Sequence, residues 1–495
     1  MRTGADKKAV NNYVLTANGG DLMNQKDLTQ GPVLKTMSLF AFPLILGNLL
    51  QQGYNVVDTW VVGKFVGPDA LAAVGSAFAL MTFLTSILLG LCMGSGVVFS
   101  VCFGKKDEEA LKNSIAMSFL LTAVITAILT TGALLSVNFI MAWMNIPIQI
   151  TDMMRVYLTI VFCGIPAVFL YNFFSSYLKS IGNSVIPLVF LGIATAVNIL
   201  LDLLFVAKFQ RGTLGAAEAT VLAQYLSGAG IAVYVFIKHP TARAAFRQWK
   251  FKKSSLKEIA GYSVLTCIQQ SVMNFGILMV QGIVNSFGTA VMAAFAAAVK
   301  IDSFAYMTAQ EYANAFSTFI AQNMGAGKKE RIKKGIRYAS VITISYCVLV
   351  SLVMWFAAGW LMRIFVDASE TAIIAEGIRY LHIEGAFYCG ISILFLFYGL
   401  YRAVGKPFMS VVLTVISLGT RVLLSYVLSA IPTIGVVGIW WSIPIGWVLA
   451  DLVGFLYYRK NAESLCKERD SLYEKQNDLK GQRQKKLQGN SIRHF

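Results

Sequence analysis

Long apolar segments alternate with short polar connections along most of this chain. Twelve such segments are visible, six on each side of a basic connector at 238–257. Each supplies the roughly 20 residues that a helix needs to cross a bilayer. The pattern therefore predicts an all-α integral membrane protein with twelve transmembrane helices in two six-helix lobes. The predicted spans are 34–63, 70–102, 114–143, 153–178, 184–207 and 214–237, followed by 258–286, 291–324, 338–363, 377–401, 407–430 and 435–458.

The composition agrees with a membrane protein. Of the 495 residues, 56% are hydrophobic and only 14% are charged, which is unusual for a soluble domain. The formal net charge of +17 raises the question of nucleic-acid binding, but the basic residues lie between the apolar segments and in both tails. We therefore expect a lipid bilayer as the surroundings and no nucleic acid as a partner. The first thirty residues are polar, so we expect no cleavable signal.

Lysine and arginine are concentrated in every second connection. These connections include 238–257, the stretch 328–337 and the connection with Arg402 and Lys406, whereas Lys208 and Arg211 are an exception on the other side. Because connections rich in positive charge stay in the cytoplasm, we predict a multi-pass protein of the cell membrane with both termini cytoplasmic. The predicted parts are an N-terminal tail at 1–33, a lobe at 34–237, a cytoplasmic linker at 238–257, a second lobe at 258–458 and a basic tail at 459–495.

Short motifs recur in the two halves of the chain. The stretch 103–106 (Phe-Gly-Lys-Lys) matches 326–329 (Ala-Gly-Lys-Lys), and 180–183 (Ser-Ile-Gly-Asn) matches 403–406 (Ala-Val-Gly-Lys) in the same register. Both halves begin and end on the same side of the membrane. This is typical of a parallel repeat of six plus six helices, and it predicts a substrate path between the lobes.

Acidic and amide side chains interrupt the apolar spans of the first half. Asp58 lies in the first span, and Asn198 and Asp202 lie four residues apart in the fifth, which places them on one helix face. A charged side chain at membrane depth costs roughly 2.5–3.5 kcal/mol and usually binds or relays cations. Alternatively, such an acid extends to the interface or stays protonated. The repeat-related positions Met279, Arg421 and Ser425 carry no acid, so we predict a cation site within the first lobe.

The motifs also resemble a known family, the multidrug and toxic-compound extrusion (MATE) transporters. The resemblance covers about residues 34–460 and rests on Pro43 with the stretch 51–63, on 70–75 (Ala-Leu-Ala-Ala-Val-Gly), on 177–183 with Asn198 and Asp202, and on 322–327 (Gln-Asn-Met-Gly-Ala-Gly). It implies a two-lobe fold of twelve helices that exports organic cations in exchange for protons or sodium ions.

Within the family, the chain is similar to the branch whose cation site lies in the N-terminal lobe. The resemblance implies a hinge in the first helix at Pro43. The other bacterial branch has acids in its seventh and tenth helices, where this chain reads Thr266–Gln270 and Tyr388–Ser392. The cation-coupling residues implied by the resemblance are Asp58, Tyr157, Asn172, Asn198, Asp202 and Thr220.

Polar residues of the second half are candidates for a substrate-binding cleft. Gln269, Gln270 and Asn274 follow helical spacing in the seventh span and either face the cleft or join helices by hydrogen bonds. In the eighth span, Asp302 and Glu311 either attract cationic substrates or belong to an internal charge pair. Glu384 is expected near the outer face in a solvated position, and Arg421 is expected to pair with an acid or with backbone carbonyls in the second lobe.

These observations predict a secondary active multidrug exporter that antiports organic cations against H⁺ or Na⁺ by alternating access. The alternative is a related flippase of lipid-linked oligosaccharides, but its anionic cargo would require several buried basic residues, and only Lys300 and Arg421 are expected to be buried. The sequence has no nucleophile–base pair, metal-ligand spacing or nucleotide-binding loop. We therefore expect no enzymatic activity and no cofactor besides the coupling ion, and we expect a monomer.

Overall fold

The computed structural model describes residues 27–143, 150–248 and 250–461, and its secondary structure within these ranges is entirely helical. The prediction of an all-α protein is confirmed. Most of the predicted N-terminal tail and the tail beyond residue 461 lie outside the described residues.

The helices follow one another with short connections. In the first half they are α2 (Val33–Phe65), α3 (Pro68–Gly104), α4 (Glu108–Leu135), α5 (Val137–Trp143), α6 (Thr151–Cys163), α7 (Ile165–Ser180), α8 (Val185–Asp202), η2 (Leu203–Lys208) and α9 (Gly212–Lys238). After α10 (Pro240–Arg247), the second half has α11 (Lys253–Asn285), α12 (Thr289–Gly325), α13 (Lys329–Phe365), α14 (Thr371–Ala386), α15 (Tyr388–Ala403), α16 (Pro407–Ser429) and α17 (Val437–Asn461).

The number of candidate membrane spans agrees with the sequence pattern. The part of the chain that the structure describes has 11 helices long and apolar enough to cross a membrane, or 12 if the bent pair α14 and α15 forms one span. This pair bends by 52°. The predicted tenth span, 377–401, thus corresponds to two helices joined at Phe387.

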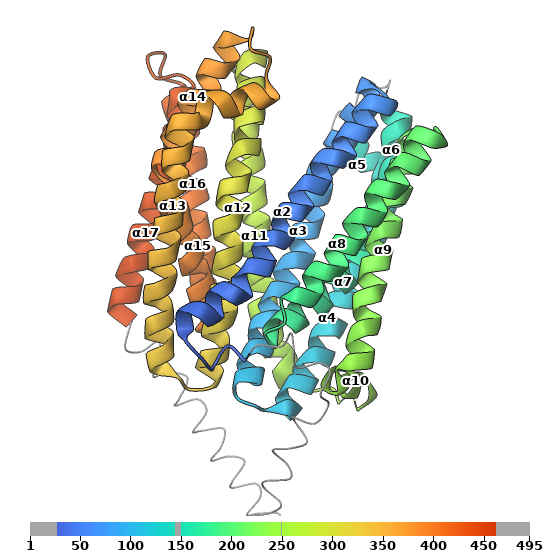
Figure 1. The fold of residues 1–495 in the computed structure, drawn as a ribbon, viewed down its shortest axis with the longest axis vertical. Helices are drawn as coiled ribbons and strands as arrows, with labels where there is room; N and C mark the ends of the chain where they lie inside the picture. The colour runs from blue at the N-terminus through green and yellow to red at the C-terminus, as the bar shows by residue number, and fades with distance from the viewer. Residues whose placement is uncertain (1–26, 144–149, 249, 462–495) are drawn as a thin grey trace, which may run out of the picture.

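Two groups of helices form the two lobes. In Figure 1, α2–α9 and α11–α17 converge toward the end that carries α10 and spread apart toward the opposite end. In the half of the molecule toward the α10 end, the backbones of α3 and α11 come very close together. A Cβ added to Gly90 or Gly94 of α3 would lie 2.5 Å from the Cα of Cys267 or Ser263 in α11. Only glycine permits this approach, and it brings Ser95 Oγ within 2.9 Å of Ser263 Oγ.

Helix α2 belongs to both lobes. Its first turns, with Met37 and Phe40, pack into the core of the second lobe, whereas Val61 and Val62 near its end pack into the core of the first. Figure 1 shows α2 running diagonally across the molecule. Pro43 lies between these two parts, and the helix continues through it without a break. A change in the bend of α2 would therefore move the lobes relative to each other.

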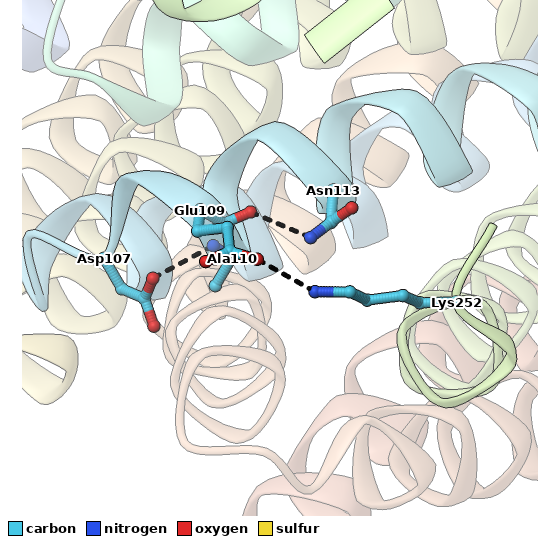
Figure 2. Close-up of polar contacts among 5 residues, drawn as sticks. All are labelled: Asp107, Glu109, Ala110, Asn113 and Lys252. Carbon is cyan, nitrogen blue, oxygen red and sulfur yellow. Dashed lines mark hydrogen bonds and ion pairs between the residues drawn. The ribbon is translucent and has the colours of Figure 1, made fainter. Parts of the chain in front are cut away.

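The connector between the lobes is fastened to the start of α4 (Figure 2). Asp107 caps this helix by accepting a hydrogen bond from Ala110 N at 3.0 Å. Lys252, directly before α11, donates to Glu109 Oε1 at 3.2 Å. The ion pair is exposed and contributes little energy by itself, but it places the beginning of the second lobe beside the first.

Candidate functional site

The two acids of the first lobe, Asp58 of α2 and Asp202 of α8, meet in the half of the lobe away from α10. Asp202 is fully buried and Asp58 is half-buried. Their carboxyl groups are in side-chain hydrogen-bond contact with each other. Oδ1 of each carboxyl has no hydrogen-bond partner among the described residues. Two carboxyl groups can share a hydrogen bond only when one carries a proton, so the pair is suited to holding a proton.

The amide of Asn198 holds Asp202 from the preceding turn of α8. In the amide orientation that satisfies both of its ends, the nitrogen donates to Asp202 Oδ2 at 3.0 Å and the oxygen accepts from Thr220 N of α9 at 3.3 Å. The predicted neighbours Asn198, Asp202 and Thr220 are thus brought together by contacts within and between helices.

Two tyrosines complete the cluster. Tyr157 of α6 is buried and lies near both acids. Tyr54 of α2 lies beside Thr220 and is also near both acids. Tyr54 was missed by the sequence analysis, although its position four residues before Asp58, and thus on the same helix face, could have identified it.

Two of the resemblance-based predictions are less directly connected to this cluster. Asn172 of α7 is half-buried, and its amide donates to Val168 O at 2.8 Å. This bond lies within its own helix, and no contact with Asp58 or Asp202 is recorded within the described residues. Pro43 lies four turns before Asp58 on α2 and can act only through the shape of that helix.

The helix widens directly after Asp202. Residues Leu203–Lys208 form a π-helix, a rare form that occurs frequently at functional sites. Nothing in the apolar pattern of 203–208 distinguished this segment from an α-helix. The wider turn changes the direction in which side chains beyond Asp202 point.

A second buried acid cluster lies within the second lobe. Asp302 of α12 lies against Glu384 of α14 and Tyr388 of α15, and Arg421 of α16 interacts electrostatically with both acids. The expectation of a solvated Glu384 was wrong, because this residue is 1% exposed. Arg421 lies near the two acids, but no ion pair within 4.0 Å joins it to either of them among the described residues.

The remaining cleft candidates lie where the lobes meet. Gln269 and Gln270 of α11 are buried and line a small cavity between the lobes. Asn274 donates to Gln270 O at 3.2 Å, so its amide bonds within α11. Glu311 of α12 interacts with Lys179 of α7 in the first lobe and is therefore positioned between the lobes.

The structure corrects two further expectations about basic residues. Lys300, expected to be buried, is exposed. Arg402, expected in a connection, lies in the last turn of α15 and is only 4% exposed. Lys300 lies within the predicted span 291–324, and Arg402 directly follows the predicted span 377–401. The sequence could not predict their exposure, because it depends on how each helix is rotated against its neighbours.

Comparisons with known proteins agree with the fold. The sequence model of the MatE family matches residues 43–204 and 264–427. The probable multidrug resistance protein YpnP of Bacillus subtilis (strain 168) is 31% identical over 441 residues, covering 88% of this chain and 97% of its own. The probable multidrug resistance protein YoeA of the same organism is 28% identical, with 88% and 96% covered.

A solved structure shows the same fold. It is described as the outward-facing conformation of a multidrug resistance MATE family transporter, and it matches with a TM-score of 0.83 at 22% sequence identity, covering 88% of this chain and 98% of its own. The family consists of transporters rather than enzymes. From the match of the family model over most of its length, and from relatives of nearly the same extent, this chain belongs to the MatE family of multidrug and toxic-compound extrusion transporters.

Proposed function

We propose that this protein exports organic cations in exchange for protons that bind at Asp58 and Asp202 of the first lobe. The observation that carries the proposal is the carboxyl–carboxyl contact of these residues inside an apolar helix bundle. One shared proton removes the repulsion between two carboxylates, and its loss restores that repulsion. The two carboxyl groups therefore attract each other when the pair holds a proton and repel each other when it does not. A coupling site requires such a difference in interaction energy between its two states.

Asn198 supports a proton over a sodium ion when its amide takes the orientation that satisfies both of its ends. Sodium is bound by oxygen atoms, but in that orientation the nitrogen faces Asp202 and the oxygen accepts from Thr220 N. An amide N–H stabilises a carboxylate and repels a cation. For sodium, the amide would have to rotate and give up both hydrogen bonds.

Alternating access would use α2 as the moving element. The α10 end, where most lysines and arginines of the connections lie, is placed in the cytoplasm by the positive-inside rule. Since the lobes converge at this end and spread apart at the other, the arrangement in Figure 1 supports an outward-facing state. Asp58 lies on the part of α2 that packs into the first lobe, beyond Pro43, so protonation of the pair can influence the bend of the helix.

The charges between and within the lobes favour a cationic or zwitterionic cargo over the pyrophosphate of a lipid-linked oligosaccharide. Arg421 stands beside the acids Asp302 and Glu384, and Arg402 interacts with Glu311. The two acids balance the charge of Arg421. Arg402 and Lys179, by contrast, share the charge of Glu311, so the site can hold one carboxylate. A pyrophosphate requires several buried positive charges, and the flippase alternative is therefore disfavoured.

Transport by purified protein in liposomes tests the proposal. A fluorescent organic cation should accumulate against its gradient when a proton gradient is imposed, and a sodium gradient alone should not drive it. Asp58→Asn and Asp202→Asn should each abolish this accumulation, while Asp152→Asn, which removes an exposed acid at the start of α6, should not.

Three outcomes would contradict the proposal. Uphill transport driven by a sodium gradient alone would refute the proton as the coupling ion. Undiminished transport by both Asp58→Asn and Asp202→Asn would refute the proposed coupling site. Loss of coupling in Asp302→Asn or Glu311→Gln, with normal coupling in Asp202→Asn, would place the coupling in the second lobe.

A further inference from the structure

A buried arginine with spare hydrogen-bond donors lies at the boundary of the lobes. Arg402 is 4% exposed, and its Nη2 donates to Asn314 Oδ1 of α12 at 3.2 Å. Its Nε and Nη1 are buried and have no hydrogen-bond partner within the described ranges. A buried donor left without a partner costs free energy, more so when it is charged. This side chain is therefore incomplete without an acceptor.

The guanidinium lines a small cavity to which both lobes contribute. Met93 of α3 comes from the first lobe, and Gln269, Gln270, Gln310 and Arg402 come from the second. The cavity offers about 10 Å³, close to the room that one water-sized oxygen atom needs. Three of these side chains are amides, each with an N–H₂ group that can donate to an anionic oxygen. The lining thus combines a positive charge with several donors.

The nearest acid does not occupy this position. Glu311 is joined to Arg402 through Asn314, whose nitrogen donates to Glu311 Oε1 at 3.3 Å while its oxygen accepts from Arg402. Glu311 also interacts with Lys179 from the first lobe. Its charge is therefore shared between two cations, and Arg402 keeps the capacity to bind a second anionic group.

We propose that Arg402, with Gln269, Gln270 and Gln310, forms an anion-binding subsite that takes the carboxylate of a zwitterionic cargo. The inference rests on the exporter function proposed above and extends it to the class of substrate. A carboxylate fits because one of its oxygens can enter the small cavity. The cationic part of the same cargo would lie toward the wider end between the lobes.

The matched dyes rhodamine 110, a free carboxylic acid, and rhodamine 123, its methyl ester, test the proposal. Their affinities for the full-length protein in lipid nanodiscs are measured by fluorescence polarisation. In Arg402→Gln, the ratio of rhodamine 110 affinity to rhodamine 123 affinity should fall at least about tenfold, since a hydrogen bond between charged groups is worth that much or more. Arg363→Gln, which removes an exposed arginine in the last turn of α13, is the matched control.

Two further variants keep the test decisive if Arg402→Gln does not fold. Glu311→Gln removes the acid that competes for Arg402, so the same affinity ratio should rise. Gln310→Leu removes a donor from the cavity lining, so the ratio should fall. A positioning role of Arg402 alone would change both dye affinities equally and would not produce opposite changes in the ratio.

The outcomes separate the subsite from the exporter function. An unchanged ratio in folded Arg402→Gln, or in both other variants, overturns the carboxylate subsite even if rhodamine 123 is exported normally. Affinities for both dyes that depend on chloride in the wild type but not in Arg402→Gln would assign the site to a free anion and also overturn it. Failure of the wild type to export rhodamine 123 under a proton gradient would contradict the exporter function instead.

Discussion

Replacing Gly104 with alanine should weaken the closure of the lobes at the α10 end. Gly104 is the last residue of α3 and lies against the backbone of Gln322 in α12. A Cβ at this position would meet the Gln322 carbonyl group, with the carbonyl carbon at 2.8 Å and Cα at 3.0 Å. Ordinary contacts between carbon atoms are about 3.5–4.0 Å, so the two backbones must separate by roughly 0.7 Å or more.

Gln322 cannot move away from Gly104 without weakening its own side-chain hydrogen bonds. Its side chain accepts from Leu28 N at 3.1 Å and donates to Ser180 O of α7 at 2.7 Å, which links the N-terminal segment and both lobes. Overpacking of this kind costs about 1–3 kcal/mol, and the cost applies only while the lobes are in contact. The ratio of closed to open molecules at the α10 end should therefore fall by a factor of about 5–150.

Distance measurements between spin labels test this expectation. Labels at Glu108 and Arg337, exposed positions of α4 and α13 near the α10 end, report the separation of the lobes in nanodiscs. Gly104→Ala should increase the population with the longer distance. Gly261→Ala, in a helix position where a Cβ meets nothing within 4 Å, should leave the distribution unchanged. If the two variants behave alike and resemble the wild type, the α3–α12 contact does not control closure.

Two further expectations concern the α10 end. Burial by itself would raise the pKa of Asp27. The opposing effect of the hydrogen bonds with Thr29 and Gln30 and of the charge of Lys328 is larger, so the pKa lies below its ordinary value. Because the pKa of Asp27 is lower in the folded protein than in the unfolded chain, its carboxylate stabilises the folded segment at pH values above the unfolded pKa. Hydrogen-exchange protection of Leu28 N–H should therefore persist from neutral pH down to about pH 4 and be lost below it. Equal protection of Leu28 N–H in Asp27→Asn at neutral pH would contradict this expectation. In a background without the seven native cysteines, a membrane-impermeant maleimide should label Lys252→Cys only from the cytoplasm and Ser369→Cys only from outside, and the reverse pattern would overturn the proposed orientation.

The candidate cation site could be predicted in large part because its members stand out from their apolar surroundings. Asp58, Asn198 and Asp202 are recognisable as polar residues within predicted spans, and helical spacing places the last two on one face. Tyr54 and Glu384 were not recognised correctly. Tyrosine is common in membrane helices, and the burial of an acid near a helix end depends on which neighbouring helices cover it.

The amino-acid pattern by itself determined the number of spans, the six-plus-six repeat and the presence of acids in the first lobe. These properties depend on local hydropathy and spacing, which each segment carries independently of the others. Only the tertiary structure decided that Asp58 meets Asp202, that α2 packs into both lobes, and that Arg402 is buried beside the lobe boundary. Each of these depends on the depth and rotation of one helix relative to another, and packing between helices, rather than local pattern, sets both.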